Sequence, residues 1–303
     1  MEFKIRTYDE KYLETQVELG NQIMKDWKFQ NQSNLEHLKK VYARDDFQPD
    51  TRIYATSKDE QLLGFQTSQV LSDKESNQTV ARMEFPLVKD DDWSICQALQ
   101  DASEEAVKKR GADLMRVRAS PHWGDTVQLA EKFGFTYEKP HLMTSRIPMA
   151  QMKIIEELRY SFIKIQREDE TSIDLFREIF PKRFPMRYEG EVDSWFDYYE
   201  DRDPAVWIIL LEDNQPMGHL IGFLNDKTVS FTSLFSLGDN QARKLQELLS
   251  YAYMSLTQSQ ISQTIKEIAL SIGDDQVPYA EALNQLGLQL QNQIAYYVKE
   301  VKK

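Results

Sequence analysis

The sequence predicts an α+β protein, with a mixed and mostly antiparallel sheet flanked by helices, built as two copies of one fold. Two similar phrases support this prediction: Phe133-Gly134-Phe135 and, 153 residues later, Leu286-Gly287-Leu288. Each closes an apolar-periodic run and leads into a β-like segment. A glycine just past a helix is the usual C′ residue, because only glycine adopts the left-handed conformation without steric cost.

The elements that precede these two glycines also repeat. Gly64 lies 70 residues before Gly134, and Gly218 lies 69 residues before Gly287. The first strands match as well, since residues 5–10 resemble residues 165–170 in sequence. We therefore expect domains at 1–149 and 161–303, joined by a short connecting arm at 150–160.

In the first copy, apolar residues at helical spacing predict helices, and capping residues mark where two of them begin. Ser33 or Asn34 caps the second helix, and Asp92 or Ser94 caps the third. Polar turns separate three segments that are typical of antiparallel strands. The expected strands are 3–8, 52–57, 62–70, 79–87, 114–117 and 135–147, and the expected helices are 10–24, 34–43, 94–110 and 125–133.

The second copy follows the same order, β-α-α-β-β-β-α-β-α-β. Pro181 and Pro185 end its first helix, because proline cannot continue a helical hydrogen-bond pattern. Polar turns again separate three central strands. The expected strands are 162–166, 206–211, 219–224, 229–234, 267–272 and 291–298, and the expected helices are 171–180, 192–199, 240–256 and 277–286.

Composition excludes several classes of partner. A net charge of −12 argues against nucleic acid and against an anionic membrane surface as the main partner. No apolar stretch approaches 18 residues, so we expect no membrane segment, and the first residues do not resemble a signal peptide. The single cysteine, Cys96, excludes an internal disulfide and fits a cytoplasmic location. Four scattered histidines give no metal-ligand spacing, so we expect no metal.

The element order resembles the GNAT acyltransferase fold, and the best match is the phrase Ala130-Glu131-Lys132-Phe133-Gly134-Phe135. The resemblance covers nearly the whole chain as a tandem pair. It implies an acetyl-CoA-dependent N-acetyltransferase, in which the amine of a small molecule or peptide attacks the thioester directly. In that family a glycine-containing loop opens the third helix, and its backbone N–H groups hold the pyrophosphate of the cofactor.

Neither copy keeps that loop. The first copy has acidic Asp90-Asp91-Asp92 there, whereas the second has Gln241-Ala242-Arg243-Lys244. By resemblance, the predicted cofactor-binding residues are therefore Gln241, Arg243 and Lys244. Both copies also lack the tyrosine that protonates the departing thiolate in the family. Tyr279, one turn before the equivalent position in the second copy, is predicted to replace it.

The resemblance places a carboxylate general base in the fourth strand, where this chain has Glu84. The alternative is a solvent-facing strand glutamate. In the second copy, Arg183, Arg187 and Trp195 are predicted to bind an acceptor with an apolar body and an anionic group. Their alternative role is packing between the domains.

Two functional classes stay open at this point. The leading one is the N-acetyltransferase, and its rival is a catalytically silent GNAT-fold module used for ligand binding or assembly. The altered loops and missing tyrosines favour the rival. A chain can keep the GNAT fold without the activity, because a fold does not determine a function. Whether the copies pair within one chain or between chains, as in a homodimer, is also open.

Overall fold

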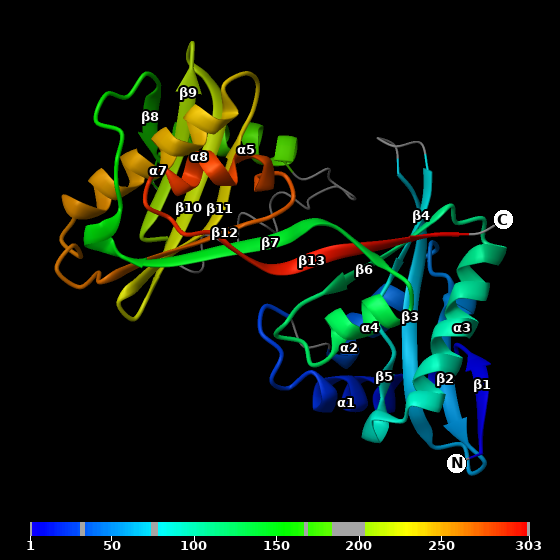
Figure 1. The fold of residues 1–303 in the computed structure, drawn as a ribbon. Coiled ribbons are helices and arrows are strands. Elements are labelled where there is room, and N and C mark those ends of the chain that lie inside the picture. Colours follow the sequence, from blue (N-terminus) through cyan, green and yellow to red (C-terminus); the bar gives the residue numbers. More distant parts are fainter. Residues whose placement is uncertain (1, 31–33, 74–77, 167–168, 184–203, 302–303) are drawn as a thin grey trace. The chain divides into compact units, whose positions relative to one another are not determined.

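The computed structural model describes residues 2–30, 34–73, 78–166, 169–183 and 204–301 (Figure 1). The chain divides into two compact units. We call Met1–His141 with Gln293–Lys303 unit 1, and Leu142–Asn292 unit 2. In both units the described elements follow the order that the sequence predicts.

Unit 1 has a sheet in which neighbouring strands are antiparallel except for the parallel pair β4–β6. Its sheet order is β1-β2-β3-β4-β6, followed by β13 and β7. Short 3₁₀ turns lie at Glu10–Tyr12, Pro49–Thr51 and Lys89–Asp91. The strands are β1 (Phe3–Thr7), β2 (Arg52–Ser57), β3 (Leu62–Asp73), β4 (Gln78–Met83), β5 (Leu87–Val88) and β6 (Leu114–Ala119), and the helices are α1 (Leu13–Ile23), α2 (Leu35–Tyr42), α3 (Trp93–Lys109) and α4 (Thr126–Lys132).

Unit 2 repeats this arrangement, with β11 and β12 as its parallel pair. The predicted helix at 192–199 lies outside the described residues. Further 3₁₀ turns lie at Met149–Gln151 and Val277–Tyr279. The strands are β8 (Ser161–Lys164), β9 (Val206–Glu212), β10 (Gln215–Asn225), β11 (Thr228–Ser236) and β12 (Glu267–Ile272), and the helices are α5 (Glu170–Arg183), α7 (Gln241–Thr257) and α8 (Ala280–Asn284).

Two long strands, β7 (Thr136–Pro148) and β13 (Gln291–Glu300), contain the points at which the chain passes from one unit to the other. Residues 143–148 of β7 pair with β12 in unit 2. Residues 295–300 of β13 pair with β6 in unit 1. The predicted range 161–303 places this last strand with the second copy, whereas in the compact units most of it belongs to unit 1.

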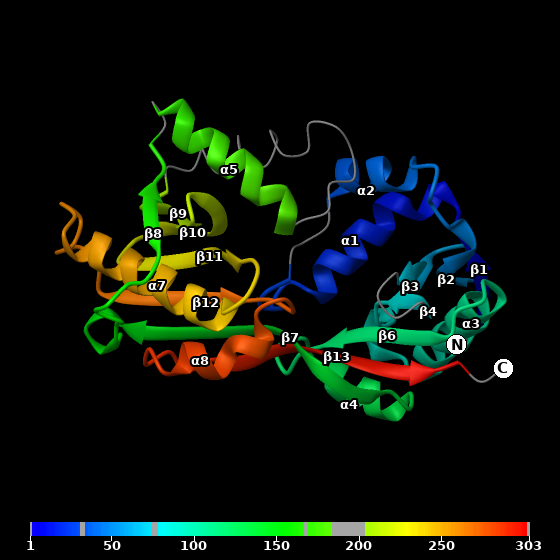
Figure 2. The same ribbon diagram turned by 90° about the horizontal axis from the view of Figure 1, so that it is seen from above.

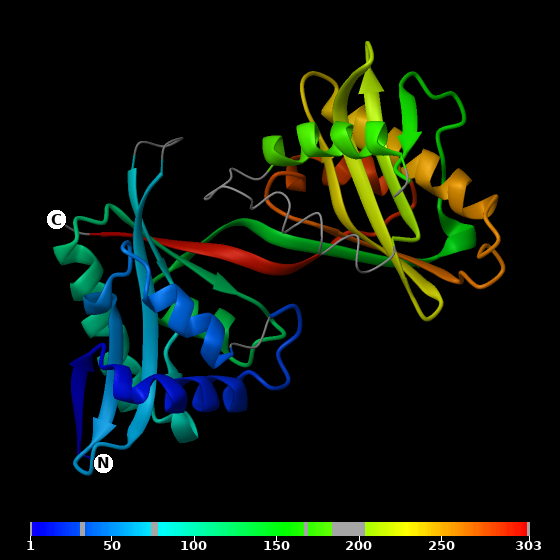
Figure 3. The same ribbon diagram turned by 180° about the vertical axis from the view of Figure 1, so that it is seen from behind.

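Each sheet is covered on both faces, and alternate residues of its strands face different helices. In β2 of unit 1, Ile53 and Ala55 belong to the cluster around α3, and Tyr54 belongs to the cluster around α1. Figure 3 shows α1 and α2 on one face of this sheet and α3 on the other. In β9, Ile208 belongs to the cluster around α7, and Ile209 belongs to the cluster around α5. Figure 2 shows α5 and α7 on different sides of strands β9–β11.

Two strand glycines support the predicted repeat directly. A Cβ atom added at Gly64 would lie 2.9 Å from the carbonyl oxygen of Leu87 and 3.2 Å from Leu99 Cδ1 of α3. At Gly218 it would lie 2.7 Å from the carbonyl oxygen of Phe235 and 3.2 Å from Leu248 Cδ1 of α7. Both glycines therefore allow the same close approach of a strand and a helix, which makes the two positions equivalent.

Most predicted helix boundaries are close to the observed ones, but the prediction that Pro181 ends the helix is wrong, because α5 continues through it to Arg183. The side chain of Asn34 accepts a hydrogen bond from the N–H of His37, as expected of the cap of α2. Gly134 and Gly287 both have a positive φ, of 79° and 84°, which confirms their role at helix ends. The predicted strand 79–87 is wrong in one respect, because β4 ends at Met83 and the chain resumes pairing only at β5.

None of the helices within the described ranges combines the length and the apolar character needed to cross a bilayer.

Candidate active site

The interruption between β4 and β5 is a β-bulge. Ser68 of β3 pairs with Met83, and Phe65 pairs with Leu87, so three residues of one strand oppose two of the other. The N–H of Glu84 still donates to the carbonyl of Thr67, at 2.9 Å. A bulge bends its strand and changes the direction of a side chain. In unit 1 the bulge begins with Glu84.

The bulge also marks the place where two parallel strands part. The pairing of β4 with β6 ends at Met83 and Val117. Beyond that point residues 87–88 pair with β3, while β6 continues to Ala119. Three cavities adjoin this opening, and all of their lining residues belong to unit 1.

The first, which we call the α1–α2 cavity, has a volume of about 240 Å³. Helix residues such as Val17 and Met24 line one side, and the bulge residues Glu84 and Phe85 line the other. The lining is mainly apolar, with two tryptophans, Trp27 and Trp123. It suits a ligand with an apolar body.

The second, the α4 cavity, has a volume of about 400 Å³ and lies between residues 85–88, the start of α3 and helix α4. It shares Phe85, Leu87, Trp27, Trp123 and Thr126 with the α1–α2 cavity. The shared residues make the two cavities neighbours.

The two tryptophans form a fixed wall. Their rings stack with centroids 5.5 Å apart and an interplanar angle of 8°. Trp123 is 1% exposed, and its Nε1 donates to the carbonyl of Lys28 at 2.6 Å. A buried ring with its N–H satisfied keeps one position, so this wall is pre-formed.

The third, the arginine cavity, has a volume of about 390 Å³ and is lined by Arg52, Arg82, Arg116 and Arg118. It shares four residues with the α1–α2 cavity, namely Arg52, Thr67, Glu84 and Arg118. Glu84 therefore faces an apolar space and a cationic one.

The carboxylate of Glu84 forms an ion pair with the guanidinium of Arg118 at this junction. The distance from Arg118 Nη2 to Glu84 Oε1 is 2.7 Å. The side chain of Glu84 is 46% exposed and that of Arg118 is 33% exposed, so ligands can reach both. The sequence-predicted base thus lies on the wall of a cavity, held by an ion pair.

The N-terminus of α3 does not fit a diphosphate. Asp92 Oδ1 accepts hydrogen bonds from the N–H groups of Ser94, at 2.9 Å, and Ile95, at 3.4 Å. The hydroxyl of Ser94 also donates to it, and this bond chiefly lowers the pKa of Asp92. A carboxylate therefore occupies the place where a phosphate of the cofactor would bind.

The N-terminus of α7 in unit 2 differs. Asn240 and Gly238 have positive φ values of 57° and 68°, and within the described residues the Asn240 side chain makes no capping hydrogen bond. The amide of Gln241 donates to the carbonyl of Ser236 at 3.1 Å. Its oxygen accepts a hydrogen bond from the hydroxyl of Tyr279. Two of the predicted residues, Gln241 and Tyr279, are thus brought together.

The predicted cations of α7 have partners within the unit. Lys244 is fully buried, and its Nζ lies 2.6 Å from Glu212 Oε2 and 2.9 Å from the carbonyl of Leu237. Arg243 Nε lies 2.6 Å from Oε1 of the buried Glu247. Binding of phosphate by Lys244 would require this ion pair to open.

Of the residues predicted to bind the acceptor, the structure describes Arg183, while Arg187 and Trp195 lie outside the described residues. Arg183 is 11% exposed in its side chain and ion-pairs with Asp275 at 3.2 Å. Its Nη1 donates to Ser233 Oγ at 2.9 Å. The ring of His219 contacts the same hydroxyl at 2.8 Å.

His219 is a buried group that the sequence did not reveal. Desolvation first, and the positive charge of Arg183 second, lower its pKa well below 6.5. The aromatic rings of Phe176, Phe180 and Phe235 surround it. A neutral histidine in such a place stabilises the fold by packing and by its hydrogen bond.

The arginine cavity was also missed by sequence reasoning. Its signal lies in two strand segments, Arg82-Met83-Glu84 and Arg116-Val117-Arg118, in which charged residues alternate with buried apolar ones. Alternation of this kind places the charges on one face of a sheet. Only the parallel pairing of β4 with β6 shows that the two segments are neighbours.

Within the described ranges, no group of three or more His, Cys, Asp or Glu side chains is placed to hold a metal ion.

No protein-family model matches this sequence, and no curated protein matches it either. Several solved structures are similar to this chain. A tandem GNAT protein from the clavulanic acid biosynthesis pathway has 12% identity and a TM-score of 0.57, covering 100% of this chain and 99% of its own. A GCN5-related N-acetyltransferase from Sphaerobacter thermophilus has 13% identity and a TM-score of 0.52, with coverages of 99% and 96%.

A third similar structure is a GCN5-related N-acetyltransferase from Anabaena variabilis, with 10% identity and a TM-score of 0.61. It is matched over 99% of this chain and 73% of that one. At such identities the similarity concerns the fold.

Proposed function

We propose that this chain, whose fold is a tandem of two GNAT domains, carries an N-acyltransferase site in unit 1. One observation supports the proposal most: Glu84, at a bulge where two parallel strands part, lines a mainly apolar cavity whose neighbour extends between the separated strands. A base must be able to reach its substrate, and this carboxylate is 46% exposed at the cavity wall.

The α1–α2 cavity holds the acceptor, with its amine at Glu84. The carboxylate takes a proton from the amine, and the amine nitrogen then bonds to the acyl carbon. The C–S bond of the thioester breaks as the C–N bond forms, and the thiolate that leaves takes a proton from water. The rigid wall of Trp27 and Trp123 positions the reactants, because two side chains locked by stacking and by a hydrogen bond lose no further freedom.

An acyl-CoA, acetyl-CoA in the simplest case, would supply the acyl group as a thioester. Its arm suits the α4 cavity, whereas its phosphates need contacts other than the N-terminus of α3, which Asp92 caps. Lys132 is the cation that lines the α4 cavity. A separate cofactor site at the start of α7 in unit 2 stays a prediction. Its predicted cofactor contacts are Gln241, Arg243 and Lys244, and its predicted acid is Tyr279.

The second candidate is a silent GNAT-fold module for ligand binding or assembly. The Asp92 cap favours it, because the carboxylate repels the phosphates of the usual donor. Several other features likewise stay predictions. They are a peptide acceptor, a homodimer, a cytoplasmic location, and acceptor binding by Arg183, Arg187 and Trp195.

Replacement of Glu84 by Gln tests the enzyme proposal. We expect kcat/KM for acyl transfer at neutral pH to fall about 100-fold, since the amide cannot accept the proton. Amide product would be measured by mass spectrometry over a panel of primary amines, with acetyl-CoA as donor. Glu105→Gln, which removes a carboxylate from an exposed part of α3, is the matched control and should retain full activity.

Equal activity in Glu84→Gln and wild type would show that Glu84 is not the base. If the wild type forms no amide with any amine, and acetyl-CoA also fails to raise its melting temperature, the silent module becomes the better description.

A further inference from the structure

We propose that the arginine cavity binds an oxyanion carried by the acceptor. The substrate of unit 1 would then be an amine that has both an apolar body and an anionic group. This inference rests on the proposed function, because it assigns the cavity beside Glu84 to the same substrate. It defines a substrate class that the fold alone does not.

The first argument is a repulsion built into the sheet. Arg82 of β4 and Arg116 of β6 are direct partners in the parallel register. Their side chains line the same cavity. Like charges directly opposite each other on neighbouring strands are destabilising. An anion between them would remove this cost.

The second argument is the balance of charge. Arg116 Nη2 lies 2.6 Å from Glu138 Oε1, and Arg118 pairs with Glu84. Arg82 has no ion pair or side-chain hydrogen bond in the part of the chain that the structure describes. Among the described residues, the four guanidinium groups of this cavity thus form ion pairs with two carboxylates, in a protein whose net charge is −12. The cavity therefore has a local excess of positive charge, although the chain as a whole is negatively charged.

The third argument is Arg52, which is 8% exposed and has no carboxylate in ion-pair contact within the described ranges. Its Nη1 donates to Thr51 Oγ1, at 2.8 Å, and to the carbonyl of Ser68. Its Nε is buried without a hydrogen-bond partner. A buried charge without a counter-charge is destabilising, so an anionic ligand would stabilise this arrangement.

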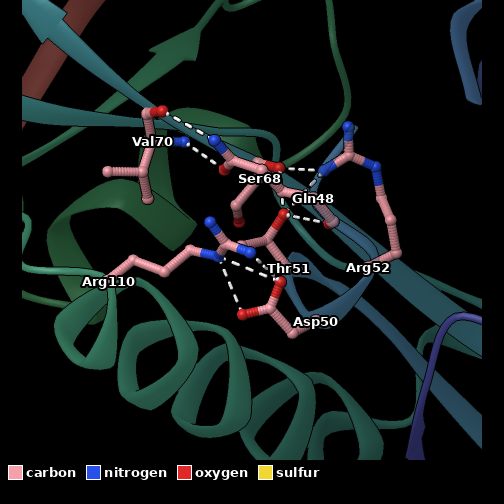
Figure 4. Close-up of polar contacts among 7 residues, drawn as sticks. All are labelled: Gln48, Asp50, Thr51, Arg52, Ser68, Val70 and Arg110. Carbon is pink, nitrogen blue, oxygen red and sulfur yellow. Dashed lines mark hydrogen bonds and ion pairs between the residues drawn. The ribbon is translucent and has the colours of Figure 1, made fainter. Parts of the chain in front are cut away.

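Figure 4 shows Arg52 and the neighbouring acid, Asp50, which pairs with another arginine. Asp50 is two residues away, but Arg110 binds both of its oxygens, with Nε at 2.9 and 2.7 Å. The guanidinium of Arg110 is the chief cause of the lowered pKa of Asp50. Thr51 and Ser68 hold Arg52 through neutral oxygens, and its guanidinium also lies 5.4 Å from the ring centroids of Tyr42 and Phe47. None of these contacts carries a full negative charge, so the position of Arg52 is fixed without a carboxylate partner among them.

The position of the cavity defines how the substrate lies. Arg52, Glu84 and Arg118 line both the arginine cavity and the α1–α2 cavity. A substrate with its oxyanion among the arginines and its body in the α1–α2 cavity has its amine near Glu84. An α-amino acid with a large apolar side chain is the simplest carboxylate of this class. A phosphate ester of an amine is the corresponding alternative.

A binding experiment without turnover tests the anion site alone. We would titrate the whole chain by calorimetry with 3-phenylpropanoate, its neutral amide 3-phenylpropanamide, and 2-phenylethyl phosphate. We expect the carboxylate to bind at least tenfold more tightly than the amide, because a charge-assisted contact is lost. Tighter binding of the phosphate than of the carboxylate would assign the oxyanion to a phosphate ester. Equal affinities for the carboxylate and the amide would overturn the proposal.

Two arginine variants and one control make the test specific. Arg82→Gln, on an exposed side chain, should weaken the carboxylate about tenfold and leave the amide unchanged. Arg52→Lys keeps the charge but loses the planar fork, and should also weaken it. Arg44→Gln makes the same charge change at an exposed position outside all three cavities, and should have no effect. Wild-type affinity in Arg82→Gln would contradict the proposal even if Arg52→Lys does not fold.

Turnover separates this inference from the proposed function. Phenylalanine should be acylated with a lower KM than 2-phenylethylamine, which lacks the carboxylate. Equal KM values with efficient turnover of both would support the acyltransferase and overturn the anion site. Binding of the carboxylate without acylation of any amine would support the anion site and contradict the acyltransferase.

Discussion

The two units place the same β-bulge at the same point of the sheet and put different side chains on it. In unit 2 the register of β10 with β11 shifts between Ile221 and Gly222, and Thr232 is the extra residue. It lies four residues before Ser236, the partner of Gly218, as Glu84 lies four residues before Val88, the partner of Gly64. The backbone feature is common to both units, and the carboxylate belongs to unit 1.

The helix that follows the bulge shows the opposite pattern. The N-terminus of α3 is capped by the carboxylate of Asp92, whereas that of α7 has no side-chain cap from Asn240. Ile95 and Lys244 lie four residues before the equivalent Leu99 and Leu248, and both are buried. The candidate base and the uncapped helix are therefore in different units. The two copies of the fold therefore differ at the positions of the proposed site.

The largest effect on stability is expected from the buried cation of unit 2. Glu212→Gln removes the carboxylate that pairs with the fully buried ammonium of Lys244 and should lower the free energy of unfolding by about 3 kcal/mol. The double variant Lys244→Met/Glu212→Gln should recover part of the loss, because it leaves no unpaired buried charge. Urea unfolding measures both. No loss in Glu212→Gln would mean that the ion pair is unimportant to unit 2.

A smaller difference is expected between the two helix-ending glycines. At Gly134 an added Cβ meets nothing within 4 Å, so Gly134→Ala should cost only the strain of a positive φ, about 1 kcal/mol. At Gly287 the Cβ would also lie 2.7 Å from the carbonyl oxygen of Gln151. Gly287→Ala should therefore cost at least about 2 kcal/mol in thermal or urea unfolding. Equal costs would show that the segment at Gln151 moves aside freely.

The smallest effect concerns His219, whose position in unit 1 is occupied by Phe65. Because its pKa is lowered in the folded state, the unfolded chain binds a proton first as pH falls below about 6.5. Stability from this group is present above that pH and declines below it.

His219→Phe, which copies the residue of unit 1, should remove this part of the pH dependence. Melting temperatures of unit 2 measured between pH 5.5 and 8 would show it. An unchanged slope in the variant would assign the pH dependence to other groups.

Much of the fold could be predicted from the sequence because its signals are local. Asn34 caps α2, and Gly134 and Gly287 end their helices, through backbone geometry that a few adjacent residues determine. The strand β12 was predicted with its observed bounds, since a short apolar run between polar segments can form few structures other than a strand. Glu84 was identified as a candidate base through the family resemblance, and that role stays a prediction.

By itself, then, the sequence determined the order of elements, their caps and the twofold repeat of one fold. Only the tertiary structure decided that β13 pairs with β6, that Lys244 is buried against Glu212, and that Arg52 meets Arg82, Arg116 and Arg118 in one cavity. The reason is physical. Strand register, burial and ion pairing depend on residues far apart in the chain, and a local pattern of charges is the same whether it faces water or a cavity.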